Sequence, residues 1–225
     1  MNFFDTDSIA SRLDYGTLIE ALREGFRGDF TSPVRQAHET NSSDDSKLFL
    51  IKPAWDDDNT VVKLLTVNAS NPAEGRPFIQ GVIVIFDKET GAPVGVMDAV
   101  EITNRRTAAA SALAADYLAR SDASVLTVIG TGSLAPHMAH AHAAKRPISK
   151  VNVVGRCADK AKAVADALNS ANPMLNAHVA SDVDEATAEA DIVSTVTSSP
   201  TPVINGERIS AGTHIDLVGA FRPDT

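Results

Sequence analysis

A glycine-rich turn at residues 130–135 has the spacing that binds the pyrophosphate of a dinucleotide. Its Gly-x-Gly-x-x-Ala pattern contains Gly130, Thr131, Gly132, Ser133 and Ala135. The first glycine permits a tight turn, the second lets the backbone approach the phosphates, and the alanine lets helix and strand pack closely. N–H groups at the start of the following helix would attract phosphate. We expect a dinucleotide site here; the alternative is a structural turn that binds no ligand.

The elements around this turn decide what the pattern means. Residues 125–129 form a mostly apolar run typical of a buried parallel strand, and the alanine-rich run at 135–144 is typical of a helix. Strand, glycine turn and helix in this order are the context in which the motif binds a dinucleotide. Further strands are predicted at 151–154, 177–179, 192–196 and 215–218. Because helical segments alternate with these strands, the second half of the chain predicts a Rossmann domain.

The end of the second of these strands indicates which dinucleotide is bound. An NAD-binding fold usually carries an acidic residue there, about 20 residues after the glycines, on the ribose 2′-hydroxyl. In this chain the strand is followed by Arg156, with Lys160 nearby. An arginine can form two hydrogen bonds with a 2′-phosphate, which a carboxylate would repel. We therefore expect NADPH to be favoured, with NAD as the alternative because Asp159 is close; Arg156 could instead be a solvated surface charge.

Two arginines near the start of a long helix are candidates to bind a carboxylate. The alanine-rich segment 98–120 predicts the helix, and Arg105 and Arg106 oppose its dipole at that end. A substrate carboxylate would make this placement favourable, since a guanidinium binds it in bidentate geometry. The alternative is an ion pair with Glu101, about one turn earlier.

Two further cations lie in segments that predict strands. Lys63 interrupts an apolar run at 60–67, and Arg35 lies in a weakly alternating segment at 31–38. The pattern alone favours a solvent-facing Lys63, because buried unpaired lysine is rare. Arg35 has the same ambiguity, and the pattern alone favours a solvent-facing side chain over one that points into a pocket.

Three histidines in the helix after the glycine turn do not predict a metal site. His137 and His140 share a helix face, His142 does not, and no cysteine or carboxylate accompanies them. We expect solvated helix residues and no bound metal.

Composition excludes several classes of protein. The 225 residues carry a net charge of −9, which argues against nucleic acid or an anionic membrane as a partner. The single cysteine, Cys157, excludes an internal disulfide and fits a reducing cytoplasm. The first residues do not resemble a signal peptide, and no apolar run approaches the roughly 20 residues of a membrane helix. We therefore expect a cytoplasmic protein.

The first half of the chain is dominated by predicted strands, so we place a domain boundary near residue 120. Residues 1–120 predict an α+β domain, and residues 121–225 predict the Rossmann domain of an overall α/β fold. A helix is expected after a cap at Asp5, and another at 15–26 with Leu18, Ile19, Leu22 and Phe26 on one face. The expected strands are 31–38, 47–53, 60–67, 80–87 and 92–97, with a hairpin at 88–91. A complete Rossmann fold has six strands, so we expect a C-terminal segment to be absent.

Together these residues resemble the ornithine cyclodeaminase/μ-crystallin family. The similar stretches are Arg35, Val62-Lys63 with Asn68 and Asn71-Pro72, Thr103-x-x-Arg106-Thr107, the 130–135 turn, Asp191 to Thr197, and Gly219 to Asp224. The set is specific and extends over the whole chain, whereas no single stretch is specific.

The resemblance implies an N-terminal substrate and dimerisation domain followed by a Rossmann domain. A homodimer interface would draw on residues 30–100. Carboxylate binding falls on Arg35 and Arg106, and an active-site role falls on Lys63. This reverses the interpretation of both Lys63 and Arg35 from pattern alone. Cofactor contacts are implied at the glycine turn and at Thr107, Thr197 and Gly219. The family's C-terminal segment returns to the first domain, and this is the part that we expect the chain to lack.

One departure from the family pattern selects a branch. Cyclodeaminases carry an acidic catalytic residue just after a Gly-Gly pair, whereas here Gly219 and Ala220 are followed by Phe221. The chain is more similar to the reductase branch, which uses NADPH, in agreement with Arg156. We expect NAD(P)H-dependent reduction of a small cyclic ketimine carboxylate, Δ1-pyrroline-2-carboxylate or Δ1-piperideine-2-carboxylate. The alternatives are an ornithine cyclodeaminase or alanine dehydrogenase that uses NAD, and a protein that binds NADPH and a small ligand without turnover.

Overall fold

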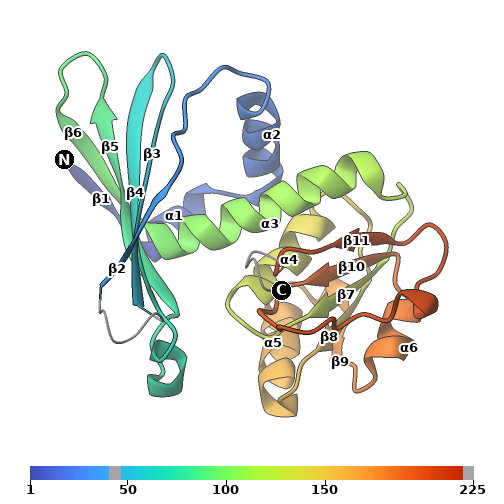
Figure 1. Ribbon diagram of the computed structural model, residues 1–225. Coiled ribbons are helices and arrows are strands. Elements are labelled where there is room, and N and C mark those ends of the chain that lie inside the picture. Colours follow the sequence, from blue (N-terminus) through green and yellow to red (C-terminus); the bar gives the residue numbers. More distant parts are fainter. Residues whose placement is uncertain (41–46, 220–225) are drawn as a thin grey trace. The chain divides into compact units, whose positions relative to one another are not determined.

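The computed structural model describes residues 1–40 and 47–219, which form two compact units (Figure 1). Unit 1 consists of Met1–Asp14 and Arg23–Thr103, and unit 2 consists of Tyr15–Leu22 and Asn104–Thr225. The division therefore falls inside helix α3 (Ala99–Leu118), not at its end near residue 120.

Small side chains explain why most of α3 groups with unit 2. Ala108, Ala109 and Ala112 are fully buried in the core of that unit. Alanine lets a helix approach its neighbours closely, and an alanine-rich helix carries little sequence signal about which sheet it covers. Ile19 of helix α2 (Tyr15–Gly25) belongs to the same core, although it precedes all the strands of the second unit in the chain.

In its described part, unit 1 holds a six-stranded sheet with the order β1-β6-β5-β4-β3-β2. Neighbouring strands are antiparallel, except for the parallel pair of β1 and β6. The elements are β1 (Asn2–Phe4), α1 (Thr6–Arg12), β2 (Gln36–Glu39), β3 (Lys47–Trp55), β4 (Asn59–Asn68), the 3-10 helix η1 (Asn71–Glu74), β5 (Ile79–Asp87) and β6 (Pro93–Asp98).

Local chemistry sets the ends of several elements as the sequence predicts. The Asp5 carboxylate accepts a 2.9 Å hydrogen bond from the Ser8 backbone N–H and caps α1. In the hairpin between β5 and β6, the Asp87 carboxylate accepts from the Thr90 backbone N–H at 2.8 Å. Gly91 completes this turn with φ of 70°, which a glycine adopts without strain.

Other segments of unit 1 differ from the sequence-based expectation. The strand expected at 31–38 is reduced to β2, so Arg35 lies just before a strand and not within one. Pro33 has no N–H to donate to a ladder, which limits pairing there. The sequence does not predict β1, because three residues are too few to show a period. Phe26 lies beyond the end of α2 and is 65% exposed, so it does not extend the apolar helix face.

Unit 2 contains a parallel sheet with the order β11-β10-β7-β8-β9. The chain starts at central β7, proceeds to β9, and then crosses to β10 on the other side, which is the Rossmann arrangement and confirms the predicted fold class. The elements are β7 (Val125–Ile129), α4 (Leu134–Ala143), β8 (Lys150–Val154), α5 (Ala158–Ala171), the 3-10 helix η2 (Pro173–Leu175), β9 (Ala177–Val179), α6 (Val183–Ala188), β10 (Ile192–Thr195), the 3-10 helix η3 (Gly206–Arg208) and β11 (His214–Asp216).

The core of unit 2 lies along the central strands. Leu126 and Val128 of β7, Val151 and Val153 of β8, and Ile192 of β10 are fully or almost fully buried. Both faces of a parallel sheet are covered, so such strands consist of continuous apolar runs, and this is why the sequence predicted them well. Among the described helices, none is both long and apolar enough to cross a membrane.

Candidate functional site

The first glycine of the turn between β7 and α4 has a conformation that only glycine adopts easily. Gly130 has φ of 131°, and a Cβ atom there would lie 2.7 Å from the Val196 carbonyl oxygen. Its N–H donates a 2.9 Å hydrogen bond to the Val154 carbonyl, which fixes the turn between β10 and β8. The tight turn predicted from the sequence is therefore present.

The space next to Gly132 is open, whereas the space next to Gly130 is filled by neighbouring backbone. A Cβ atom at Gly132 would meet no atom within 4 Å, and Gly132 and Ser133 are both exposed. Ala135 is fully buried and packs α4 against the core, as the pattern predicts. The Ser133 side chain does not cap α4. The start of the helix is thus positioned on its strand by Ala135, while the backbone at Gly132 is accessible.

The ends of β10 and β11 meet the glycine turn at the carboxyl edge of the sheet. The Val196 N–H donates to the Ile129 carbonyl at 2.8 Å, and the Gly219 N–H donates to the Thr195 carbonyl at 2.8 Å. A Cβ atom at Gly219 would collide with the Thr197 carbonyl oxygen. Ligands of open α/β sheets bind at this edge, where the strand order reverses between β7 and β10.

Two glycines outside the motif allow neighbouring segments to pack closely at this edge. Besides Gly219, Gly155 at the end of β8 leaves room for the Thr131 methyl group, with which a Cβ atom would collide. The resemblance already implied a role for Gly219, and a glycine directly after a predicted strand is the signal that could have identified Gly155. Arg156 follows Gly155 in an exposed bend, and Lys160 is exposed in the first turns of α5.

In unit 1, Lys63 does not face solvent as the pattern alone indicates. Its side chain is half-buried, and its Nζ donates a 2.6 Å hydrogen bond to Thr103 Oγ1 on α3. The Thr103 hydroxyl in turn donates to the Ala99 carbonyl. Arg35, in contrast, is exposed in the segment that leads into β2.

The two arginines of α3 have different surroundings. The Arg105 guanidinium carbon lies 5.2 Å from the centre of the Tyr15 ring, which is a cation–π contact. Arg106 is exposed, although desolvation by the surrounding protein lowers the pKa of its guanidinium. Asp98 caps the helix, because its carboxylate accepts from the Glu101 backbone N–H at 2.8 Å. Thr107 follows Arg106 and is half-buried.

The expectation that the histidines of α4 are solvated is wrong. His142 is fully buried; its Nε2 lies 3.2 Å from Ser194 Oγ and 3.6 Å from Asp216 Oδ2. His137 Nδ1 is 2.6 Å from the Tyr15 hydroxyl oxygen. The sequence could not show that His142 is buried. In an alanine-rich helix the apolar residues lie on every side, so the pattern does not reveal which face the sheet covers.

His140 is half-buried. Its ring stacks on Tyr15 with centroids 6.3 Å apart, and burial, together with the charge of Arg105, lowers its pKa. Within residues 1–40 and 47–219, no group of three or more histidine, cysteine, aspartate or glutamate side chains is arranged to hold a metal ion.

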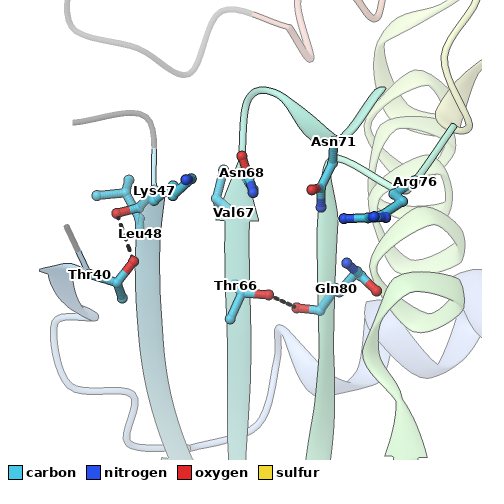
Figure 2. A pocket seen from close by; sticks show the side chains of 9 residues that line it. All are labelled: Thr40, Lys47, Leu48, Thr66, Val67, Asn68, Asn71, Arg76 and Gln80. Carbon is cyan, nitrogen blue, oxygen red and sulfur yellow. Dashed lines mark hydrogen bonds between the residues drawn. The ribbon is translucent and has the colours of Figure 1, made fainter. Parts of the chain in front are cut away.

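A small open depression in unit 1 does not contain the predicted substrate residues. It lies where β3, β4 and β5 approach η1, and Figure 2 shows the side chains around it. Arg76 contributes a positive charge but is paired with Glu74 at 3.1 Å. Its lining residues are Thr40, Lys47, Leu48, Thr66, Val67, Asn68, Asn71, Arg76 and Gln80. Ala220 and Phe221, on which the distinction from cyclodeaminases depends, lie outside the described residues.

The strand order and the glycine turn of unit 2 define an α/β protein with a Rossmann-type domain. The sequence profile of the ornithine cyclodeaminase/mu-crystallin family matches residues 6–225. This chain belongs to that family. It is 32% identical over 228 residues to a Delta(1)-pyrroline-2-carboxylate reductase from Colwellia psychrerythraea, with 100% of this chain and 72% of that protein covered.

Two solved structures are similar to nearly the whole chain. One is Thermococcus litoralis Delta(1)-pyrroline-2-carboxylate reductase in complex with NADH and L-proline, with a TM-score of 0.88 and 28% identity over 96% of this chain and 68% of that chain. The other is an archaeal alanine dehydrogenase dimer with bound NAD, with a TM-score of 0.85 and 27% identity over 96% of this chain and 66% of that chain.

Proposed function

We propose that the protein is an NAD(P)H-dependent reductase of a small cyclic ketimine carboxylate, Δ1-pyrroline-2-carboxylate or Δ1-piperideine-2-carboxylate. The relatives named as reductases support the reaction, and the Thermococcus enzyme was solved with L-proline, the product of reducing the five-membered ring. The observation that carries the proposal is Lys63, an ammonium group held half-buried in β4 by its 2.6 Å hydrogen bond to Thr103.

The reaction adds a hydride to the imine carbon and a proton to the imine nitrogen, so that C=N becomes CH–NH. A protonated imine accepts hydride more readily, and Lys63 would hydrogen-bond the substrate and help to set its protonation. Arg35 and Arg106 would bind the carboxylate, for which a guanidinium is geometrically suited. Residues 1–120 would thus serve substrate binding and dimerisation, and residues 121–225 would bind the cofactor.

The nicotinamide cofactor supplies the hydride when it is bound. The residues that we assign to it are Thr107, Gly130, Thr131, Gly132, Ser133, Ala135, Arg156, Thr197 and Gly219. The open backbone at Gly132 and the start of α4 suit a pyrophosphate. The exposed Arg156 after β8 suits a ribose 2′-phosphate, so we propose that NADPH is preferred over NADH.

The archaeal alanine dehydrogenase favours a second candidate function, the NAD-dependent oxidation of an amino acid. One experiment separates the two. Purified protein is incubated with NADPH or NADH and Δ1-pyrroline-2-carboxylate, and loss of reduced cofactor absorbance is followed. Turnover supports the reductase. Binding of NADPH without turnover would contradict it in favour of a binding protein, and ammonia release from alanine or ornithine with NAD would favour a dehydrogenase or a cyclodeaminase.

We further propose a homodimer joined through the sheet of unit 1. No residue of the central strand β4 is fully buried, and Phe3 and Trp55 on the same sheet are 68% and 39% exposed. Large exposed apolar faces favour association, and two-fold symmetry is the commonest closed assembly. Light scattering should show a dimer that Thr66→Arg weakens, since Thr66 is an exposed residue of β4. Ala163→Arg on the exposed surface of α5 is the control and should leave the dimer intact.

A further inference from the structure

Asp216, the last residue of β11, has both carboxylate oxygens occupied by hydroxyl groups. Its Oδ1 accepts a hydrogen bond from Ser111 Oγ of α3 at 3.2 Å, and its Oδ2 accepts from Ser194 Oγ of β10 at 3.1 Å. His142 Nε2 of α4 lies 3.2 Å from the same Ser194 Oγ. Ser111, Ser194 and His142 are all buried. The carboxylate is therefore fixed by the sheet and by α4, and it holds α3 through Ser111.

Ser111 is a polar residue in a stretch of α3 that consists largely of alanine. Its neighbours Ala108, Ala109 and Ala112 pack in the core of unit 2. Methyl groups form shallow ridges, so their packing fixes only weakly how far a helix is shifted along its own axis. A directional hydrogen bond to a fixed carboxylate sets that position. Ser111 thus determines which residues of α3 lie at which level of the sheet.

A second contact gives the direction of α3 relative to the strands. Arg120, two residues after the end of the helix, forms an ion pair with Asp191, which directly precedes β10. Ser111 lies instead beside Asp216, which pairs with Ser194 near the end of β10. The helix therefore runs antiparallel to the strands, and the residues that precede Ser111 lie toward the carboxyl edge of the sheet.

The spacing places Thr107 at the level of the glycine turn. Ser194 pairs with Val128 of β7, two residues before Gly130, which corresponds to about 6.6 Å along a strand. Thr107 precedes Ser111 by four residues, which corresponds to about 6 Å along a helix and to the same helix face. Thr107 therefore lies on the side of α3 that faces the sheet, at the height of Gly130.

The Thr107 hydroxyl is available to a ligand. Within residues 1–40 and 47–219, no group forms a hydrogen bond with it, whereas the hydroxyl of Thr103, one turn earlier, donates to the Ala99 carbonyl. Thr107 is half-buried. Ligands of open α/β sheets bind at the carboxyl edge, to which this turn of α3 extends.

We propose that Ser111 and Asp216 are positioning residues for the cofactor. They hold α3 at the height at which the Thr107 hydroxyl forms a hydrogen bond with bound NADPH or NADH. This inference rests on the proposed function, which assigns Thr107 to the cofactor. Ser111 and Asp216 act through Thr107 and do not contact the cofactor themselves.

A double-mutant cycle tests this role. Fluorescence titration gives the dissociation constants of NADPH and NADH for Ser111→Ala, Thr107→Val and the double variant. Each single variant should weaken binding about 3- to 10-fold, the effect of one hydrogen bond. In the Thr107→Val background, Ser111→Ala should change the affinity less than about 2-fold, because the contact that Ser111 positions is already lost. Effects that multiply, or an unchanged affinity in Ser111→Ala, would overturn the inference.

Ser124→Ala is the matched control. Ser124 Oγ donates to the Asp191 carboxylate at 3.4 Å, so this variant also removes a hydroxyl that donates to a carboxylate, but at the amino edge of the sheet. It should leave both dissociation constants unchanged. Thermal denaturation checks folding, and Ser111→Ala suits the helix because alanine has the highest helix propensity. If Ser124→Ala weakened cofactor binding as much as Ser111→Ala, the effect would be one of general stability, and the positioning role would be refuted.

Kinetics separate this inference from the proposed reaction. With Δ1-pyrroline-2-carboxylate, Ser111→Ala should raise the KM for NADPH as it raises the dissociation constant, and kcat at saturating cofactor should stay within about 2-fold. If the imine is reduced but the cycle shows no coupling, only the positioning role is wrong. If no imine is reduced but cofactor binding shows the coupling, the reductase proposal fails and the positioning role stands. If neither cofactor binds, both proposals fail.

Discussion

The Lys63 ammonium donates a 2.6 Å hydrogen bond to the Thr103 hydroxyl, which connects the middle of β4 to helix α3. The hydroxyl is itself anchored, because it donates to the Ala99 carbonyl one turn earlier in the helix. A lysine side chain has many rotamers, and a fixed acceptor selects among them. Thr103 is thus a positioning residue for Lys63.

This relationship predicts that Lys63→Met and Thr103→Val both impair reduction of Δ1-pyrroline-2-carboxylate. Lys63→Met should abolish most activity. Thr103→Val keeps the shape but removes an acceptor for a charged donor, and should cost about 1.5–3 kcal/mol in kcat/KM, roughly 10- to 150-fold. Steady-state kinetics give these values, and thermal denaturation checks that both variants fold. Full activity in Thr103→Val would show that Lys63 needs no such support.

The sequence could not have identified this pair on its own. The two residues are 40 positions apart, and Lys63 interrupts an apolar strand in a way that is typical of a solvent-facing side chain. The turn at Gly130 was predictable, because its signal is local: an apolar run, two spaced glycines and an alanine-rich helix. The buried position of His142 and the grouping of Ile19 with unit 2 depend on contacts between distant segments, and periodicity in one short segment does not contain that information.

A second prediction separates the neighbouring arginines. Consecutive helix residues point about 100° apart, and Arg105 is engaged over the Tyr15 ring. Arg106→Ala should therefore reduce kcat/KM far more than Arg105→Ala, while both keep their cofactor affinity. Arg105→Ala should instead lower the free energy of unfolding by about 0.5–1 kcal/mol through loss of the cation–π contact. Kinetics and urea denaturation of both variants give the comparison, and greater damage to activity from Arg105→Ala would refute the assignment of Arg106.

A third prediction concerns the cofactor. If Arg156 binds the 2′-phosphate, Arg156→Ala removes a charge-assisted hydrogen bond worth about 1.5–3 kcal/mol. NADPH should then bind at least several-fold more weakly, and NADH affinity should hardly change. Fluorescence titration of both cofactors measures this. Lys162→Ala is a control with the same change in charge, since Lys162 is paired with Asp166 on the surface of α5 at 2.7 Å. Equal losses of affinity for NADPH and NADH in Arg156→Ala would contradict the assignment of Arg156 to the 2′-phosphate.

The start of β10 is fixed to the start of β7 by a carboxylate. Asp191 Oδ2 accepts hydrogen bonds from the backbone N–H groups of Ser124 at 2.8 Å and Val125 at 3.0 Å, and Oδ1 accepts from Arg120. Burial alone would raise the pKa of Asp191, but these donors outweigh it and hold the pKa below the ordinary value of 3.8. The ionised form is therefore the one that stabilises the fold.

Asp191→Asn should lower the free energy of unfolding at neutral pH by about 1.5–3 kcal/mol, because a neutral amide replaces a charged acceptor. A carboxylate whose pKa is lowered by folding contributes stability that is complete above its unfolded pKa and is lost as the pH falls through the folded pKa. The difference between the two proteins should therefore be largest near pH 7 and shrink in acid below the ordinary pKa of 3.8. Urea denaturation across this range measures it. Asp166→Asn, which removes an exposed ion-pair partner, is the control and should lower the free energy of unfolding by less than about 1 kcal/mol at any pH. If the loss of stability in Asp191→Asn stayed constant into acid, the charge of Asp191 would not be what stabilises the fold.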